Sequence, residues 1–417
     1  MEAKNPIIFH IDVNSAYLSW EAVYRLQHGD TLDLRTIPSV VGGDVTARRG
    51  IVLAKSMPTK PYKIKTGESL YSARLKCPEL VIVPPRYDLY MQCSKALISI
   101  LEEYSPSIQQ FSIDEVFLDF TNMEVHWGDP VKAAHRIKER IKKELGFTVN
   151  IGISSNKLLA KMASDLQKPD KVHTLFPYEI RDKMWPLPVE ELFMVGRATT
   201  SKLHKKGIFT IGDLATTDPK LLMQWLKSHG RLIWEFANGI EDSPVRQDYP
   251  VKGIGNSSTL PFDIEDRKTG HRALLSLTET VAIRLRDIRK SAGVLSVSIK
   301  DQDFQSCSHQ RKLDVPTHST NILYRIACQL FDEIWQGQPL RHLGVRASEL
   351  YSDDFYQLSF FEPDIERQNA LDAAVDEIRA QYGWNSIMRS CFLHSGLNPM
   401  MGGVIQEEEY PMMSSLL

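Results

Sequence analysis

The sequence lacks the usual features of membrane, secreted and zinc-binding proteins. No apolar run approaches the length of about 18 residues that a membrane-spanning helix needs, and the first residues lack a basic segment followed by an apolar one. The five cysteines are scattered and include no CxxC pair, which argues for reduced thiols and against a zinc site. We therefore expect a cytoplasmic protein.

The chain also lacks a strong overall charge, because its formal net charge is only −2. Residues 362–417, however, hold nine acidic and three basic side chains, whereas the rest of the chain holds 47 basic and 43 acidic ones. A mildly basic body is compatible with DNA binding without being diagnostic of it. The 417 residues are too many for one ordinary domain and predict about two to four.

Two adjacent acids, Asp114 and Glu115, interrupt an apolar, β-prone run at residues 107–120. Buried like charges are costly unless a cation compensates them, and a divalent metal is the simplest candidate. Neighbouring side chains on a straight strand face opposite ways, so the pair can share an ion only where the chain bends. We predict strands at 107–112 and 116–120 joined by a tight turn at the acidic pair. The alternative is a solvated acidic turn.

Asp12 ends another apolar run, residues 7–12, which predicts a central strand. Asn14 or Ser15 follows as a candidate N-cap of the next helix. Asp12 thus stands at the end of a strand, where the sites of α/β proteins are commonly built. A capping or turn role is the alternative.

The order of the predicted elements brings these acids together. Helices are predicted at 86–103, 131–145 and 157–166, the last capped by residues 154–156, and a strand at 148–153. With the first strand and the hairpin they make the split βαβ, ferredoxin-like pattern. The three carboxylates then lie on neighbouring central strands and, with the carbonyl of Val13, suit two Mg²⁺ ions for phosphoryl transfer.

Residues 30–83 form a basic region of short elements, with strands predicted at 40–43 and 50–54. Such a region offers a face for a triphosphate or a template strand, or it is a solvated surface. Its basic residues are Arg48, Arg49, Lys55, Lys60, Lys63 and Lys65.

Residues 186–214 contain a short helix, a glycine turn at Gly196, a second helix and another glycine turn. This order is typical of a helix-hairpin-helix, whose backbone N–H groups contact DNA phosphates, or of a corner in a helical bundle.

A second α/β pattern begins at residue 251. Its strands are predicted at 255–260, 295–300, 311–315 and 343–350, its helices at 269–288 and 321–335, and a last helix at 371–382.

Three motifs resemble the Y-family, or lesion-bypass, DNA polymerases, and most closely the bacterial DinB/UmuC branch. They are DVNSAY at 12–17, SIDE at 112–115 and GISSNKLLAK at 152–161, and the family's order continues with KP at 168–169 and PLRHLGV at 339–345. The resemblance covers roughly residues 5–350. It implies a multidomain α+β right-hand polymerase with a ferredoxin-like palm (5–13 and 84–175), small fingers (14–83), a helical helix-hairpin-helix thumb (176–242), an α/β little finger (251–350) and a C-terminal segment (351–417).

The resemblance implies a template-directed DNA polymerase that inserts nucleotides opposite damaged DNA. The implied partners are primer-template DNA and deoxynucleoside triphosphates, the implied cofactor is a pair of Mg²⁺ ions, and a monomer is expected. Matched position by position, the catalytic metal ligands are Asp12, Asp114 and Glu115, with the Val13 carbonyl.

The resemblance also implies roles for five further residues. Tyr17 matches the steric gate that excludes a ribonucleotide 2′-OH, and its alternative role is an aromatic of the helix core. Lys168 matches the palm lysine on the triphosphate, or is a surface lysine after a helix. Lys60 is the expected triphosphate contact of the fingers, and Gly196 and Lys65 are the expected DNA contacts.

The fingers depart from the family pattern, because Met57 and Lys60 replace the usual Tyr and Arg against the triphosphate. Lys60 keeps the charge and loses the bidentate fork. Ala16 replaces a usual aromatic beside the gate, and of the usual thumb turn the glycine Gly196 remains.

Residues 357–361, QLSFF, resemble the sliding-clamp-binding peptide of bacterial polymerases. Gln357 would offer an amide to a pocket rim, and Leu358, Phe360 and Phe361 would fill an apolar groove; the chain's own tail helix is the alternative partner. Two other functions stay open: a nucleotidyl cyclase, and a DNA- and clamp-binding accessory protein with weakened catalysis.

Overall fold

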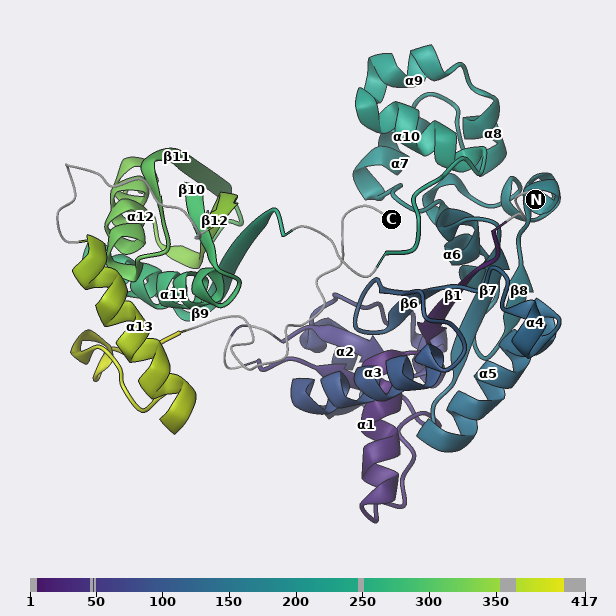
Figure 1. Ribbon diagram of the computed structural model, residues 1–417, viewed down its shortest axis with the longest axis horizontal. Helices are drawn as coiled ribbons and strands as arrows, with labels where there is room; N and C mark the ends of the chain where they lie inside the picture. The colour runs from purple at the N-terminus through teal and green to yellow at the C-terminus, as the bar shows by residue number, and fades with distance from the viewer. Residues whose placement is uncertain (1–5, 46–47, 49, 247–250, 353–364, 401–417) are drawn as a thin grey trace. The chain divides into compact units, whose positions relative to one another are not determined.

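The computed structural model describes residues 6–45, 48, 50–246, 251–352 and 365–400 (Figure 1). The chain divides into two compact units, built mainly from Met1–Gly43 with Ile51–Tyr249 and from Asp44–Gly50 with Pro250–Glu409. Within the described ranges, no helix has the length and apolar character needed to cross a bilayer.

The first unit is organised around a five-stranded sheet in the order β5-β6-β1-β7-β8. The central strand β1 is buried along its whole length and pairs antiparallel with both β6 and β7. The first four strands reproduce the predicted ferredoxin-like order, and β8, parallel to β7, is an addition. The bounds are β1 Ile8–Val13, β5 Ile108–Gln110, β6 Glu115–Asp119, β7 Val149–Ser154 and β8 Val172–Thr174.

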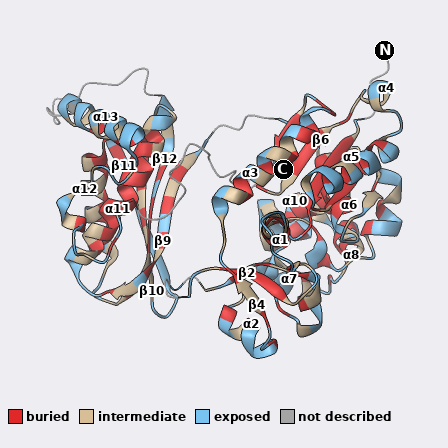
Figure 2. Ribbon diagram, turned by 90° about the horizontal axis from the view of Figure 1, so that it is seen from below, coloured by how far each residue is buried: buried red, intermediate tan, exposed pale blue. Residues whose placement is uncertain are grey.

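Two cores lie on opposite faces of this sheet, whose inner strands are mainly buried (Figure 2). Phe9, Ile11 and Val13 of β1 face the core formed with α3 and α5, whereas Ile8 faces the core formed with α6. Because strand side chains alternate, Asp12 falls on the α6 face. The helices around the sheet are α1 Ala16–Gln27, α3 Tyr87–Glu102, α4 Glu124–Trp127, α5 Pro130–Leu145 and α6 Lys157–Asp165.

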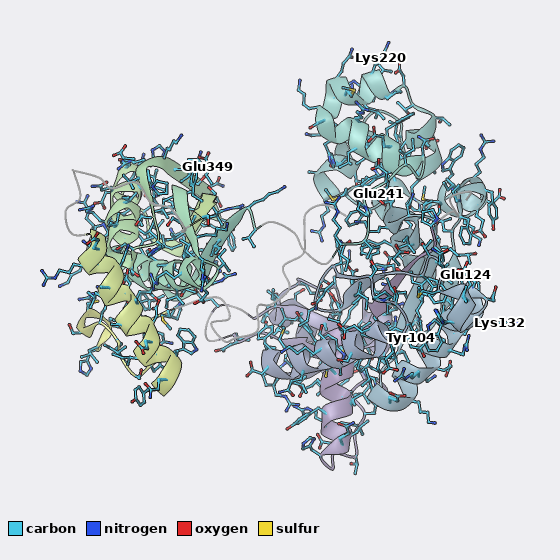
Figure 3. All side chains as sticks on the ribbon, in the orientation of Figure 1. Tyr104, Glu124, Lys132, Lys220, Glu241 and Glu349 are labelled. Atoms are coloured by element: carbon cyan, nitrogen blue, oxygen red, sulfur yellow. The ribbon has the colours of Figure 1, made fainter. Side chains whose placement is uncertain are left out.

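Local sequence sets the ends of these helices. Asp129 accepts a hydrogen bond from the Lys132 amide at 2.9 Å, and Pro130 opens α5. Gly146 ends α5 at a φ of 77°, a left-handed conformation that glycine adopts without strain. Asn156 caps α6 by accepting from the Leu159 amide at 2.8 Å, as predicted. Exposed charges such as Lys132 and Lys220 point away from the ribbon (Figure 3).

A small sheet in the order β3-β2-β4 forms a separate part of the first unit. Strands β2 and β3 were predicted, whereas β4, three residues long and parallel to β2, was not. So short a strand shows no periodicity that a sequence can reveal. The bounds are β2 Ser39–Gly42, β3 Val52–Lys55, β4 Val81–Val83, the 3₁₀ helix η1 Met57–Tyr62 and α2 Leu70–Lys76.

Residues 177–237 are wholly helical or turn-like. The predicted short helix before Gly196 is a single 3₁₀ turn, and α7 follows the glycine directly. The bounds are η2 Pro177–Glu179, η3 Ile180–Met184, η4 Val189–Glu191, α7 Arg197–His204, α8 Ile211–Thr216, α9 Pro219–Leu226 and α10 Ser228–Ala237.

The second unit contains a four-stranded antiparallel sheet in the order β11-β10-β12-β9. Its strands are longer than predicted, because polar stretches such as residues 306–310 of β11 are exposed and carry no apolar pattern. The bounds are β9 Gly253–Ile264, α11 Arg267–Asp287, β10 Lys290–Asp301, β11 Ser306–Thr317, α12 Thr320–Ile334 and β12 Leu340–Ser352.

The predicted last helix is present as α13, Ile365–Tyr382, and a 3₁₀ turn η5, Ser390–Phe392, follows it. The apolar positions that suggested the helix are not the ones that it buries, because Leu371 is 54% exposed while Asp372 is 6% exposed. Asp372 accepts a hydrogen bond from the Thr320 amide at 2.8 Å, and Asp376 pairs with Arg286 of α11 at 2.5 Å. The helix therefore packs on α11 and α12 through polar contacts.

Candidate active site

Asp114 lies in the predicted bend between β5 and β6, whereas Glu115, predicted in the same turn, is the first residue of β6. The Ser112 hydroxyl accepts hydrogen bonds from the amides of Asp114 (3.3 Å) and Glu115 (3.1 Å) and donates to Asp114 Oδ1 at 2.7 Å. The Val13 amide donates to the Asp114 carbonyl at 3.0 Å, which fastens the turn to the end of β1. The bend removes the strict alternation that would place the two acids on opposite faces.

Asp12 lies beside this turn, because it is paired in register with Glu115 across β1 and β6. Burial raises the pKa of Asp12 to about 6, although the nearby Lys168 ammonium opposes the shift. Burial also raises the pKa of Asp114. Asp12 and Asp114 therefore lie in a setting that disfavours their ionised forms unless cations compensate them.

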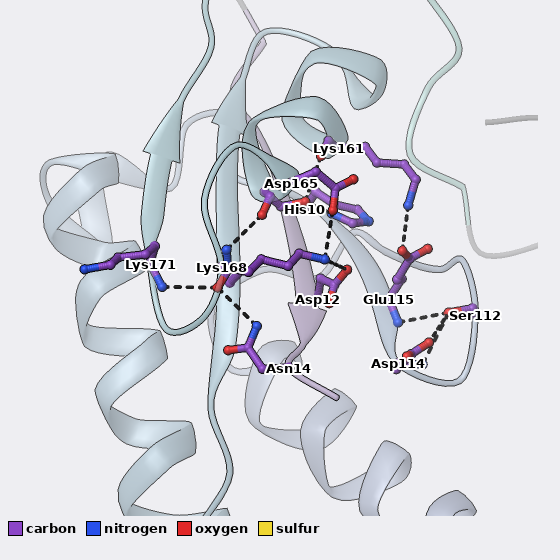
Figure 4. A network of polar contacts seen from close by, with 12 residues as sticks. His10, Asp12, Asn14, Ser112, Asp114, Glu115, Lys161, Asp165, Lys168 and Lys171 are labelled. Carbon is purple, nitrogen blue, oxygen red and sulfur yellow. Dashed lines mark hydrogen bonds and ion pairs between the residues drawn. The ribbon is translucent and has the colours of Figure 1, made fainter. Parts of the chain in front are cut away.

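Two lysines from α6 and the loop after it supply positive charge. Lys168 Nζ lies 2.8 Å from Asp12 Oδ2 and 2.8 Å from Asp165 Oδ1 (Figure 4). Burial opposes the charged form of Lys168, but the two carboxylates prevail and raise its pKa. Lys161 Nζ lies 2.6 Å from Glu115 Oε1, and the lysine residue as a whole is 7% exposed.

Lys161 was not predicted as a site residue. Its ammonium lies 5.1 Å from the ring centroid of Phe111 and 5.5 Å from that of Phe193. The available signal was a lysine among the buried apolar positions of α6, where a charged residue needs a partner.

The carboxylates fit hard divalent cations, which take oxygen ligands. In the part of the chain that the structure describes, no three Asp, Glu, His or Cys side chains converge closely enough to hold a metal. Each acid instead has a protein partner: Lys168 for Asp12, Ser112 for Asp114 and Lys161 for Glu115.

Two adjoining pockets, of about 440 and 330 Å³, open beside the acids. The first is lined by Asp12, Asp114 and Tyr17, and the second by Met57 and Lys60; Asp12, Lys55 and Lys168 line both. The pockets thus join Asp12 and Asp114 to a basic wall, whereas Glu115 lines neither pocket.

The basic wall contains two residues beyond the predicted Lys60 and Lys168. Lys55, named from the sequence only as one of the basic residues of 30–83, donates to the Ile64 carbonyl at 2.5 Å. Burial, aided by the Lys60 charge, lowers the pKa of Lys55. Arg35 was missed altogether, and its guanidinium is held by Asp33 at 2.9 Å. Nothing in the sequence around Arg35 connects it to the site.

Tyr17 is half-buried in the first turn of α1, so it both packs and lines a pocket. Its ring stacks on that of Tyr90 with centroids 4.5 Å apart and meets Tyr87 edge-on at 6.1 Å. This packing fixes the plane of the ring.

The remaining predicted site residues lie apart from these pockets or outside the described ranges. Gly196 and Lys65 are exposed, and Gly196 has open space where a side chain would be. Gln357, Leu358, Phe360 and Phe361 lie outside the described residues.

Comparison with known proteins identifies relatives of this chain. Residues 11–165 match the impB/mucB/samB family, and residues 251–360 match the C-terminal domain of that family. The chain is 49% identical over 389 residues to DNA polymerase IV of Clostridium acetobutylicum, covering 93% of this chain and 98% of that protein. It is 39% identical over 400 residues to DNA polymerase IV of Acetivibrio thermocellus, covering 94% and 99%.

A solved structure of similar fold is the Y-family DNA polymerase chimera Dbh-Dpo4(243-245)-Dbh. Its TM-score is 0.71 at 22% identity, over 83% of this chain and 99% of that one. The chain therefore belongs to the impB/mucB/samB family, a family of Y-family DNA polymerases. Within that class it is a DinB-like, DNA-directed DNA polymerase that acts in translesion synthesis, and the cyclase and accessory alternatives are not favoured.

Proposed function

We propose that the enzyme inserts nucleotides by a two-metal mechanism in which Asp12, Asp114 and Glu115, with the Val13 carbonyl, hold two Mg²⁺ ions. The supporting observation is that Asp12 and Asp114 line a basic-walled pocket, while Glu115 is paired in register with Asp12 and a lysine contacts each of these two paired acids. Bound Mg²⁺ would lower the pKa of the primer 3′-hydroxyl and neutralise charge on the triphosphate and pyrophosphate.

The basic wall would hold the triphosphate. Lys168 remains charged because its pKa is raised, and its ammonium can exchange the Asp12 carboxylate for a phosphate when the metals neutralise that acid. Lys60 and Lys55 face the same space and supply point charges in place of a guanidinium fork. Tyr17, held by Tyr90, would lie against the sugar and exclude a 2′-OH.

We assign the palm to residues 5–13 and 84–175, the fingers to 14–83, the thumb to 176–242 and the little finger to 251–350. Gly196 at the start of α7 and Lys65 would contact DNA backbone phosphates. Residues 357–361 would bind the sliding clamp, and the enzyme would act as a monomer on DNA in the bacterial cytoplasm.

Primer extension with Asp114→Ala and Glu115→Ala variants tests the metal assignment. Each should lower kcat by more than about 1,000-fold while DNA binding is retained, because charge stabilisation at the reacting phosphate is lost. Glu103→Ala is the matched control, since Glu103 is an acid of the same unit that pairs with Arg140. Near-normal extension by either acid variant would contradict the assignment.

A further inference from the structure

The loop that carries Lys168 joins α6 to β8 and has no regular secondary structure. Its backbone is held from below by Asn150, a fully buried side chain of β7. Asn150 Nδ2 donates to the carbonyls of Ser164 (2.8 Å) and Gln167 (2.7 Å). The residues bound in this way flank Lys168 on its N-terminal side.

Asn150 holds the other side of the loop with its oxygen. Oδ1 accepts from the Lys171 amide at 3.2 Å and from Asn14 Nδ2 at 3.1 Å. Both donor hydrogens and both acceptor positions of the amide are thus used, and the side chain has only one orientation that satisfies them. Asn14 extends the network, because its Oδ1 accepts from the Asp170 amide at 2.9 Å.

The helix before the loop is held against the same strand. An added Cβ at Gly152 of β7 would collide with the Ala160 carbonyl and the Ser164 amide, so α6 and β7 are in direct backbone contact. Since α6 cannot move toward the strand, the position of Lys168 depends on the loop backbone, and Asn150 is the side chain that contacts this backbone on both sides of the lysine.

We propose that Asn150 is a positioning residue for the incoming nucleotide, acting by holding Lys168 where its ammonium meets the triphosphate. The proposal rests on the proposed role of Lys168. Asn150 itself lies beneath the loop and lines neither of the two pockets beside the acids. A misplacement of about 1 Å in a binding group is enough to weaken its interaction strongly.

The competing explanation is that Asn150 merely satisfies buried backbone groups and so supports folding. The two explanations predict different nucleotide affinities for the folded variant. Support for folding alone leaves that affinity unchanged, whereas a positioning role lowers it. A matched control is available on the same strand: Ser154 is also fully buried, lies on the same face, and donates to the Leu175 carbonyl at 2.6 Å, away from the loop.

The test compares Asn150→Ala, Ser154→Ala, Lys168→Ala and the double variant Asn150→Ala/Lys168→Ala in the full chain. The equilibrium Kd of the correct nucleotide is measured with primer-template DNA, Mg²⁺ and a dideoxy-terminated primer, so that no chemistry occurs. Melting temperatures are measured in parallel.

Asn150→Ala should raise the nucleotide Kd of the folded protein about tenfold and Ser154→Ala less than about twofold. Asn150→Ala should also lower the melting temperature more, because it leaves four buried partner groups unpaired and Ser154→Ala leaves one. In the Lys168→Ala background, Asn150→Ala should add less than about twofold, because the positioned group is gone. Two results would overturn the positioning role of Asn150 without bearing on Lys168. One is full additivity of the Asn150→Ala and Lys168→Ala effects on the Kd, and the other is an effect of Ser154→Ala as large as that of Asn150→Ala.

An unchanged Kd in Lys168→Ala would instead overturn the role proposed for Lys168, and with it the function of Asn150. Should Asn150→Ala fail to fold, Asn150→Ser carries the same comparison. Asn150→Ser should raise the Kd about threefold in the parent protein and have little effect on the Kd in the Lys168→Ala background. An equal effect in both backgrounds would overturn the proposal.

Discussion

Replacing Lys161 with methionine removes one of the two cations that neutralise the acids. Methionine keeps most of the aliphatic stem over Phe111 and Phe193, so the change is mainly electrostatic. Breaking a buried ion pair costs about 3–5 kcal/mol, and the Glu115 side chain is 17% exposed, so we expect the lower limit. The metal-free variant should lose about 3 kcal/mol of unfolding free energy.

Saturating Mg²⁺ should recover most of this loss, because the ion supplies the missing charge. If the difference from the parent protein falls to about 1 kcal/mol, linkage requires the variant to bind Mg²⁺ about 30-fold more tightly. Urea unfolding in EDTA and in Mg²⁺ measures the difference in unfolding free energy, and titration calorimetry without DNA measures the Mg²⁺ affinity.

Lys138→Met is the control for a buried lysine outside the site. Lys138 is 7% exposed, and its Nζ lies 2.8 Å from both Asp170 and Glu139. Its loss of stability should be the same with and without Mg²⁺. Two results would refute the idea that Lys161 supplies a positive charge that bound Mg²⁺ can replace. One is an equal loss of unfolding free energy with and without Mg²⁺ for Lys161→Met, and the other is Mg²⁺ binding no tighter than in the parent.

Three further predictions concern the nucleotide and the metal. Tyr17→Ala should raise ribonucleotide relative to deoxynucleotide incorporation by about 100-fold or more, measured as the ratio of kcat/KM values, and an unchanged ratio would remove Tyr17 from the gate. Lys60→Arg should lower the KM for deoxynucleotides about threefold by restoring a fork, whereas Lys63→Arg, outside the pocket lining, should not. Burial raises the pKa of Asp12 to about 6, so its ionisation destabilises the metal-free protein as pH rises from about 4 through 6. The same proton competes with metal, so Mg²⁺ affinity by calorimetry should weaken as pH falls from about 7 to 5, and a constant affinity would contradict the pKa.

The sequence predicts much of the first unit, because long periodic elements are readable. Strand β1, the hairpin β5–β6 and helix α6 follow from apolar spacing, and the acids draw attention because buried like charges need compensation wherever they occur. Asp12 and Glu115 do pair in register, as the ferredoxin-like order requires.

The sequence does not predict which face of α13 is buried. The apolar residues at 371, 374, 375 and 378 predict one buried face, yet the helix buries Asp372 and Arg379 instead. The reason lies on α11, where the side chain of Glu279 is 4% exposed and lies 3.7 Å from the Arg379 guanidinium, and where Arg286 pairs with Asp376. A buried charge on one helix needs a charged partner on another helix, and the spacing of apolar residues along a helix does not show where that partner lies.

For the same reason, the sequence reveals the acids of the active site but not the residues that support them. An acid in an apolar run is conspicuous in the sequence because its cost is a property of its immediate surroundings. Lys161 and Asn150 acquire their roles only from Glu115 on another strand and from carbonyls of a distant loop. Asn150 reads from sequence as a polar interruption of a strand, and only the folded chain shows that it uses all four of its hydrogen-bonding positions. Supporting residues of this kind are therefore found by accounting for buried polar groups in the structure, and their substitution is the sharper test of how the site is held in place.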